Sequence, residues 1–599
     1  MWIGLIFVTG IVIIASWGSY YSRLLAKIWG ERHDAVTPAV SINDGRDYVP
    51  TPTPVVFAHH FASIAGAGPI LGPVIALCYG WLPAVLWVVL GGLLIGAVHD
   101  YLATHITLRE GGESVAVVAR RVLGKGAFAA FAIFLVVSLA LVCATFLNLS
   151  ARARESAIPL GSLGAKTLPS FIQIQNGQAM IGGIASTSVI IITIFSPLVG
   201  WLYLKKQVAV WKCSILAIII CAIGTIIGIY RPVQLHPETW KIALSIYVFF
   251  AAGLPVWLFL QSRDFINVHM LYAGMVVLGI TVLTTTFAGT AQGASASIPA
   301  TDFVTGQKAL GLFWPFFFIT IACGAVSGFH SLCAGGTTCK QLKSEPAARH
   351  VGYWAMLLET TLSLMVITVM VMGLVRNDYL VLTHPQSVSV SGKSNPILAF
   401  AMALGNTIKG TFGFSPIAGA IAAMLLLEGF LVTTLDTAVR LMRYLLQEVW
   451  KTIFNIDSED EFNIAVQKRP VIHFFTHHYF NSAIAVALML FFSYSAGILA
   501  LWGLFATANQ LLAGFVLGLG SIWLIQKKRK VVYTVLPAIF MLITTGASLW
   551  LHLCKFRPGT ANANPTLFTA SIALVVLTLY LIYKGLSVII RTRARSNQG

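Results

Sequence analysis

The chain has 599 residues, of which 57% are hydrophobic and only 10% are charged. Soluble globular proteins carry about 25% charged residues, so this composition excludes an ordinary water-soluble protein and indicates a polytopic membrane protein. The formal net charge of +18 does not indicate nucleic-acid binding, because the basic residues lie in short clusters between apolar stretches, as in cytoplasmic loops.

Apolar stretches of about 20 residues, each long enough to cross a bilayer as a helix, recur along the whole chain. They lack the period-2 alternation of barrel strands, so we predict an all-α protein with about fifteen transmembrane helices. The expected spans are residues 2–22, 56–79, 80–107, 126–149, 183–203, 212–230, 241–262, 268–288, 310–333, 351–375, 412–437, 480–500, 502–524, 531–552 and 566–590.

The loop cations predict the orientation. With the N-terminus outside and the C-terminus in the cytoplasm, most of the 39 Lys and Arg residues fall in cytoplasmic segments, as the positive-inside rule requires. The first apolar stretch has no preceding positive charge and no cleavage-site pattern, so we expect it to be retained as a span. We therefore predict a multi-pass protein of the bacterial inner membrane.

The second span contains an unusual density of helix breakers. Five of the eight residues between Gly66 and Pro73 are Gly or Pro, and both residue types weaken a helix. A static kink would explain them. A discontinuous helix, whose free backbone groups bind substrate or ion, explains them better, and its binding residues would be Gly66, Ala67, Gly68, Pro69, Gly72 and Pro73.

A second candidate break, at Gly253 and Pro255, lies five spans later in a span of opposite direction. This spacing predicts a five-plus-five inverted repeat of the leucine-transporter type, with halves 56–230 and 241–437. Residues 1–55 would form an N-terminal span and loop. Residues 438–470 would form a cytoplasmic amphipathic helix on the membrane surface and a loop, and residues 471–599 four accessory spans.

Several longer blocks resemble the carbon starvation protein A family. They are His59 to Pro73, Gly80 to Pro83, Gly96 to Tyr101, Phe318 to Ser331 with Gly336 to Thr338, Thr433 to Thr437, and Asn509 to Leu511. The resemblance implies an inner-membrane importer of peptides, amino acids or pyruvate that is induced when carbon is scarce. It also implies the leucine-transporter-type fold. This chain has His99-Asp100 where some members have Gln-Asp.

Polar residues within the apolar spans are the further candidates. Glu359 and Glu428 lie in mid-span, where a carboxyl is functional by default, and we expect one of them to carry a coupling proton or to be a structural donor. Ser327 and Ser331 would bind sodium or join helices. Gate or proton-relay candidates are His59, His60, His99, Asp100, His330 and Asp436. For the first four, which lie near the cytoplasmic ends of their spans, interfacial snorkelling or capping is the alternative role. For Asp436, an ion pair with Arg440 is expected, whereas Asn509 and Gln510 are expected to join helices.

We predict a secondary active transporter. No Walker A pattern is present, so an ion gradient of protons or sodium would drive uptake, and no catalytic motif indicates an enzyme. A channel-like facilitator or a membrane-embedded sensor is the alternative. We expect a small-molecule substrate and membrane lipid as partners, and no nucleic acid. We expect no cofactor and no metal site, because the eight cysteines are scattered without a C-x-x-C pair.

Overall fold

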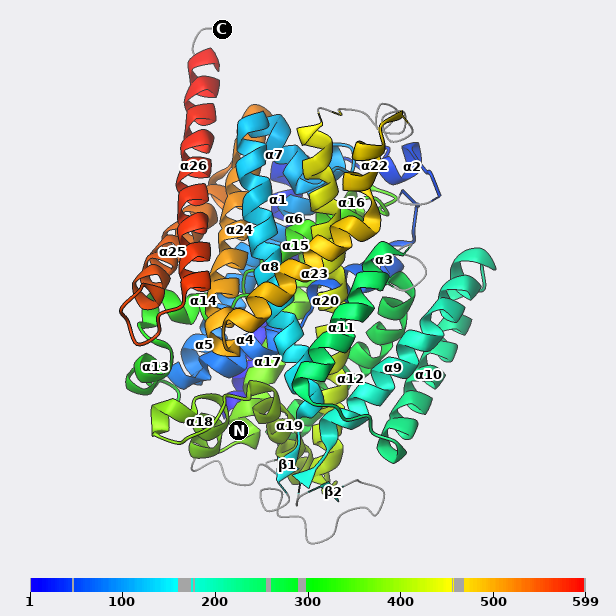
Figure 1. The fold of residues 1–599 in the computed structure, drawn as a ribbon, viewed down its shortest axis with the longest axis vertical. Helices are drawn as coiled ribbons and strands as arrows, with labels where there is room; N and C mark the ends of the chain where they lie inside the picture. The colour runs from blue at the N-terminus through cyan, green and yellow to red at the C-terminus, as the bar shows by residue number, and fades with distance from the viewer. Residues whose placement is uncertain are drawn as a thin grey trace.

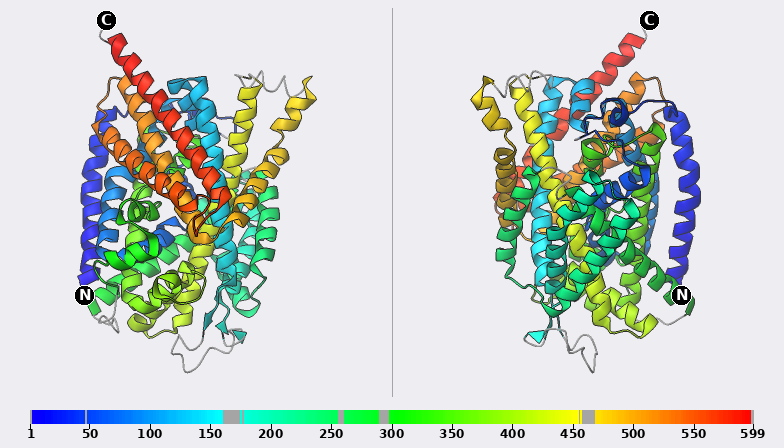
Figure 2. Two further views of the ribbon diagram at one scale, coloured as in Figure 1. Left: turned by 60° about the vertical axis from the view of Figure 1, so that its left-hand side comes forward. Right: turned by 90° about the vertical axis from the view of Figure 1, so that its right-hand side faces the viewer.

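The structure is a computed structural model, and it shows a bundle of helices that run mostly along the long axis of the molecule (Figure 1). The N-terminus and the end of the last helix lie at opposite ends of this bundle in every view (Figures 1 and 2). The structure describes residues 2–45, 48–159, 174–175, 178–254, 260–288, 298–454, 456 and 468–596.

The first half of the chain forms α1 (Trp2–Trp29), α2 (Pro38–Ser41), α3 (Thr53–Ile64), α4 (Gly68–Ala76), α5 (Trp81–Gly91), α6 (Ala97–Arg109), α7 (Val115–Leu123), α8 (Lys125–Glu155), α9 (Ile181–Gly200), α10 (Val210–Tyr230), α11 (Pro237–Gly253) and α12 (Leu260–Ala288). A π-helical turn, Gly92–Gly96, joins α5 to α6. A small antiparallel sheet in the order β1-β3-β2 follows α8 and consists of β1 (Ile158–Pro159), β2 (Ile174–Gln175) and β3 (Gln178–Ala179).

The second half forms α13 (Phe303–Leu310), α14 (Phe318–Thr320), α15 (Phe329–Cys333), α16 (Glu345–Ala348), α17 (Trp354–Gly373), α18 (Arg376–Thr383), α19 (Pro396–Phe412), α20 (Pro416–Ile453), α22 (Pro470–Thr476), α23 (His478–Ser495), α24 (Ile498–Gln526), α25 (Val532–Phe556) and α26 (Pro565–Ser596). The chain is thus an all-α polytopic membrane protein, as predicted.

The predicted count of fifteen spans is not confirmed. Among the described residues, 11 helices are long and apolar enough to cross a membrane, and two bent helix pairs raise the number to 13. The clearest difference is at residues 310–333, where a continuous span was expected and α14 and α15 are separated by non-helical backbone. The span expected at 241–262 is also divided, because α11 ends at Gly253.

The expected surface helix after residue 437 is not a separate element. Helix α20 runs without interruption through 38 residues, because no Gly or Pro follows Gly429 until after its end. The apolar positions that predicted an amphipathic surface helix, such as Leu441 and Leu445, are buried inside the protein. Amphipathicity at this position therefore reflects packing against neighbouring helices.

The predicted spans alternate the connecting segments between two sides of the membrane. Segments assigned to the same side lie at the same end of the bundle. Helices α7, α16 and α22 lie toward the end where α26 terminates, whereas β1, β2, α13 and α18 lie at the end of the N-terminus (Figure 1). This separation agrees with the predicted division of the loops into two groups. Which group faces the cytoplasm stays a prediction.

The outer helices present apolar side chains and the inner ones are covered. On α10, Trp211, Ile215 and Ile218 are 62%, 50% and 54% exposed, which suits contact with lipid. By contrast, 83% of the most apolar segment of α20 and of α24 is buried inside the protein. The polar residues discussed below lie among these buried inner helices.

Candidate functional site

The second span is broken as the sequence predicts. Helices α3 and α4 are bent by 41°, and Ala65 between them has a non-helical ψ of 69°. The break is narrower than the stretch from Gly66 to Pro73, because α4 already begins at Gly68. Pro69 stands in the first turn of α4, where a missing backbone N–H costs nothing.

A second non-helical segment, residues 321–328 between α14 and α15, packs directly against this break. A Cβ atom added to Gly68 would lie 2.4 Å from Sγ of Cys323, and one added to Gly72 would lie 2.9 Å from the carbonyl oxygen of Thr320. Only glycine allows so close an approach. The hydroxyl of Ser363 on α17 donates to the carbonyl of Pro69 at 2.7 Å and joins a third helix to the crossing.

The break predicted near Gly253 is a different one from residues 321–328, and α11 does end at Gly253. A Cβ atom on Gly253 would meet the ring of Tyr479 at 2.5 Å. Pro255 lies outside the described residues. Residues 321–328 contain no proline and only two glycines, which made that segment resemble a continuous span.

Side chains from neighbouring helices satisfy the exposed backbone around this second break. Gln510 Nε2 donates to the carbonyl of Phe318 at 2.9 Å, Trp502 Nε1 donates to Thr320 at 3.3 Å, and the amide of Phe329 donates to Asn509 Oδ1 at 2.8 Å. Non-helical backbone is stable inside a membrane protein only with such partners. Asn509 and Gln510 thus join helices, as expected from the sequence.

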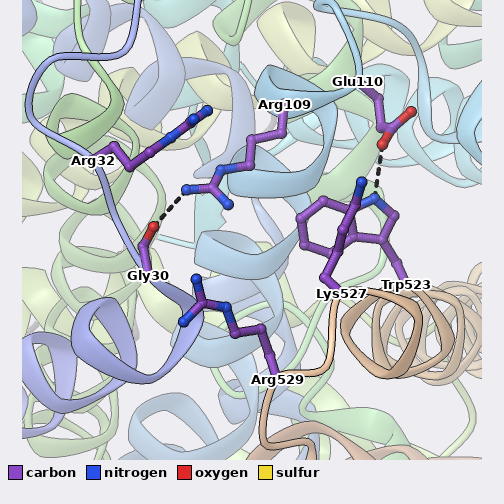
Figure 3. A pocket seen from close by; sticks show the side chains of 7 residues that line it. All are labelled: Gly30, Arg32, Arg109, Glu110, Trp523, Lys527 and Arg529. Atoms are coloured by element: carbon purple, nitrogen blue, oxygen red, sulfur yellow. Dashed lines mark hydrogen bonds between the residues drawn. The ribbon is translucent and has the colours of Figure 1, made fainter.

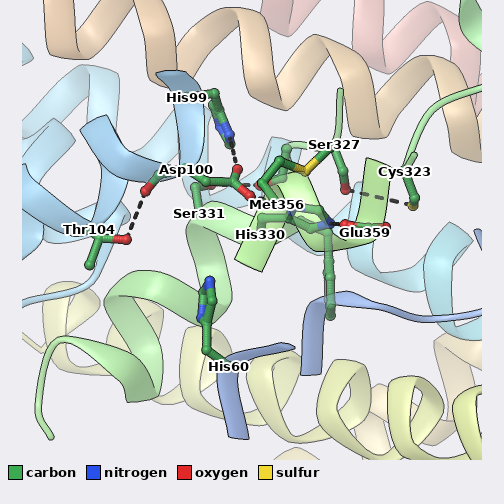
Figure 4. A network of polar contacts seen from close by, with 12 residues as sticks. His60, His99, Asp100, Thr104, Cys323, Ser327, His330, Ser331, Met356 and Glu359 are labelled. Atoms are coloured by element: carbon green, nitrogen blue, oxygen red, sulfur yellow. Dashed lines mark hydrogen bonds and ion pairs between the residues drawn. The ribbon is translucent and has the colours of Figure 1, made fainter. Parts of the chain in front are cut away.

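A chain of buried ionisable side chains lies beside the crossing (Figure 4). Nδ1 of His99 lies 2.7 Å from Oδ1 of Asp100, and the other carboxylate oxygen of Asp100 lies 2.7 Å from Nδ1 of His330. On the far side of that imidazole, Nε2 lies 3.3 Å from Oε2 of Glu359. Helices α6, α15 and α17 each contribute to this chain, and all four residues are 0% exposed.

The buried carboxylate of Glu359 has few polar partners to stabilise its negative charge. Among the described residues, neither of its carboxylate oxygens has a hydrogen-bond partner, and Nε2 of His330 has none either. The ligand atoms of Cys323, His330 and Glu359 lie within 4.8 Å of one another, so this group could hold a metal ion, and these are residue types that bind zinc. The sequence did not predict this grouping, because the three residues come from separate elements.

Glu428 lies elsewhere and has a different partner. Its Oε2 is 3.0 Å from Nη2 of Arg154, and that guanidinium stacks over the ring of Trp240 at 5.1 Å. Both charged side chains are at most 2% exposed. The sequence could not reveal this pair. Arg154 lies in the last turn of α8, and a cation just after an apolar stretch is normally assigned to a solvent-exposed loop.

The expected ion pair between Asp436 and Arg440 does not form. Asp436 pairs with Arg263 at 3.2 Å and accepts a hydrogen bond from Tyr247 at 3.1 Å. Arg440 instead donates to the carbonyl of Leu254 at 2.7 Å, beyond the end of α11. Helix ends leave free carbonyls, and a buried guanidinium satisfies them here. Arg263 is fully buried.

His59 and His60 are buried in the middle of α3. Nδ1 of His59 lies 3.6 Å from Oδ2 of Asp264, and Nδ1 of His60 lies 2.7 Å from the hydroxyl of Thr338. Asp264 was not among the sequence candidates. These contacts place both histidines near polar groups of other elements, and their role as a gate stays a prediction.

The hydroxyls of Ser327 and Ser331 are engaged within the protein. Asn509 Nδ2 donates to Oγ of Ser327 at 3.1 Å, and Ser331 donates to the carbonyl of Gly328 at 2.6 Å. Such bonds correspond to the helix-joining role that the sequence left open. Sodium binding at these hydroxyls stays a prediction.

Fold and site together define a multi-span helical membrane protein whose core encloses titratable groups at the crossing of two broken segments. The chain belongs to the family described as carbon starvation protein CstA, which matches residues 2–390 and 384–548.

The curated relatives cover nearly the whole chain. It is 28% identical to the peptide transporter CstA of Bacillus subtilis, with 95% of this chain and 94% of the relative aligned. It is 30% identical to the pyruvate/proton symporter BtsT of Escherichia coli, with 90% and 80% aligned.

Two solved structures match most of the chain at low sequence identity. MhsT in complex with L-phenylalanine matches with a TM-score of 0.39 at 12% identity, over 89% of this chain and 98% of that one. A manganese transporter of Eremococcus coleocola matches with a TM-score of 0.42 at 12% identity, over 92% and 99%.

Proposed function

We propose that this protein is a secondary active transporter that imports a small organic nutrient across the bacterial inner membrane together with a proton. Pyruvate, amino acids and short peptides are the substrate classes, because the relatives include a peptide transporter and a pyruvate/proton symporter. The chain has no Walker A pattern, so the energy would come from an ion gradient. In this proposal it is not an enzyme and binds no cofactor.

The observation that carries the proposal is the position of Glu359. Its carboxyl is fully buried and lies 3.3 Å from Nε2 of the His330 imidazole. A carboxylate without hydrogen bonds is costly to bury, and binding a proton removes that cost. Because an imidazole can gain and lose a proton near neutral pH, His330 and Asp100 would connect Glu359 to a proton path.

Glu428 and the serines are weaker candidates for the coupling site. The guanidinium of Arg154 does not lose its proton in proteins, so it would keep Glu428 ionised as a permanent structural pair at 3.0 Å. The hydroxyl of Ser327 is already bonded to Asn509, which leaves it less available for sodium.

Uptake into proteoliposomes tests the proposal. Purified protein would be supplied with labelled pyruvate, alanine or a dipeptide, under an imposed proton gradient, an imposed sodium gradient or neither. We expect saturable accumulation of one substrate class under the proton gradient, abolished by an uncoupler. Equal flux without a gradient would indicate a facilitator, and binding without any flux would indicate a sensor. A rise in protein level when carbon is exhausted would test the starvation role.

A further inference from the structure

A separate cavity of about 320 Å³ opens where the ends of α1, α6 and α24 meet (Figure 3). None of its lining residues belongs to the chain of ionisable groups around Glu359. It lies between the N-terminal helix α1, α6 of the predicted transport core and the accessory helix α24. The residues around it are Gly30, Arg32, Arg109, Glu110, Trp523, Lys527 and Arg529.

The lining of this cavity carries excess positive charge. Four of the seven lining residues are cations and one, Glu110, is an anion. A second carboxylate, Glu345, lies behind Arg109 and pairs with it at 2.6 Å, and it lies 3.8 Å from Arg32. Four cations against two carboxylates leave a surplus of two positive charges.

Both carboxylates, Glu110 and Glu345, already have partners other than Lys527 and Arg529. Glu110 accepts a hydrogen bond from Nε1 of Trp523 at 2.8 Å and pairs with Arg121 at 3.3 Å, while Glu345 faces Arg109. Within the described part of the chain, no carboxylate oxygen lies within 4.0 Å of the charged nitrogens of Lys527 or Arg529. These two cations therefore face the cavity with their charge uncompensated.

Gly30 keeps the cavity open. Its φ of +72° is a conformation that glycine adopts at no cost, and its carbonyl accepts a hydrogen bond from Nη2 of Arg109 at 2.5 Å. A Cβ atom at this position would lie 2.4 Å from Nη2 of Arg529. The backbone at Gly30 thus approaches the guanidinium of Arg529 closely. The guanidinium of Arg529 lies between the ends of α1 and α24 (Figure 3).

We propose that this cavity binds a phosphate-bearing anion. Guanidinium groups bind phosphate oxygens in pairs. The surplus of two cations would neutralise a phosphate monoester, which carries about −1.5 to −2 at neutral pH, and would more than neutralise the single negative charge of a phosphodiester headgroup. The phosphate would come from the headgroup of an anionic lipid, since basic pockets between transmembrane helices bind such groups, or from a soluble phosphate compound. Bound phosphate would link α1 and α6 to α24.

Thermal unfolding of the purified full-length protein in a neutral detergent tests this proposal. The probes are phosphatidylglycerol, phosphatidylcholine, inorganic phosphate and pyrophosphate, all at constant ionic strength. The variants are R529Q and R32Q, and the matched control is K530Q, because Lys530 is exposed, adjacent in sequence and not part of the lining. We expect an anionic probe to raise the Tm of the wild type and of K530Q.

In R529Q and R32Q the same shift should need about 10- to 100-fold more probe, the equivalent of one lost hydrogen bond between charged groups. A shift with phosphatidylglycerol alone would assign the site to a lipid headgroup, and a shift with pyrophosphate or phosphate alone to a soluble compound. The proposal is overturned if none of the three anionic probes shifts the Tm, if phosphatidylcholine shifts it as much as they do, or if all four proteins respond alike. Transport is not measured, so this outcome is separate from that of the proposed function.

Discussion

Two buried glutamates in this protein have the same sequence signature and different surroundings. Glu359 and Glu428 each lie in the middle of an apolar helix and are 0% exposed. Glu428 faces the guanidinium of Arg154, which stays charged, whereas Glu359 faces the imidazole of His330, which can change its charge. The comparison shows that the partner of a buried carboxyl, more than its burial, decides whether it can take part in proton exchange.

The largest effect is expected where the two broken segments cross beside Glu359. G68A would place a Cβ atom 2.4 Å from Sγ of Cys323, so the helices must separate. We expect uptake to be lost while the protein still inserts into the membrane. G429A, one residue from Glu428, is the control, because no atom lies within 4 Å of its added Cβ. Normal uptake by G68A would show that the crossing is not essential to transport.

E359Q directly tests the proposed proton role. An amide cannot bind and release a proton, so we expect gradient-driven accumulation in proteoliposomes to fall at least about tenfold, equivalent to about 1.4 kcal/mol. Exchange of labelled for unlabelled substrate should persist, because it needs no net proton movement. If E359Q accumulates substrate normally with an unchanged pH dependence, Glu359 is only a structural hydrogen-bond donor.

In contrast to E359Q, E428Q should lower the stability of the protein and leave proton coupling intact. It leaves the buried guanidinium of Arg154 without its counter-charge, and removing one partner of a buried pair costs about 3–5 kcal/mol. We expect a lower Tm and less folded protein, but an unchanged pH dependence of uptake per folded molecule. A selective loss of proton coupling in E428Q, at normal stability, would reverse the assignment of the two glutamates.

Q510L tests the support of the second break. It removes the donor to the carbonyls of Phe318 and Ile321, at 2.9 and 3.4 Å, and an unsatisfied buried acceptor costs about 1–3 kcal/mol. We expect a lower Tm, with Q526L at the exposed end of the same helix as the unaffected control. Equal Tm values for the two variants would mean that this side chain does not support the break.

The smallest effect is expected at a surface pair, Arg376 with Asp302, where the arginine is 47% exposed. R376Q should lower stability by at most about 1 kcal/mol. Burial acts to raise the pKa of Asp302, but its bonds to Thr305 and Arg376 hold that pKa below its ordinary value. The pair therefore stabilises the protein at neutral pH and ceases to do so as the pH falls through the lowered pKa. A Tm difference between R376Q and wild type that persists in strong acid would contradict this.

By itself, the sequence determined the membrane class, the all-helical architecture and the break near Gly66, because composition, apolar length and helix breakers act locally along the chain. It also marked Glu359 and Glu428 as candidates without distinguishing them, since a carboxyl in an apolar span is unusual wherever it occurs.

Only the tertiary structure decided which partner each buried charge has. Arg154 and Glu428, or Arg263 and Asp436, are far apart in the sequence and adjacent in space, and no local pattern records such a contact. The same holds for the break at residues 321–328. Its two glycines and missing proline permit a continuous helix, and the segment is non-helical because Trp502, Asn509 and Gln510 from α24 satisfy backbone groups that a helix would otherwise bond internally.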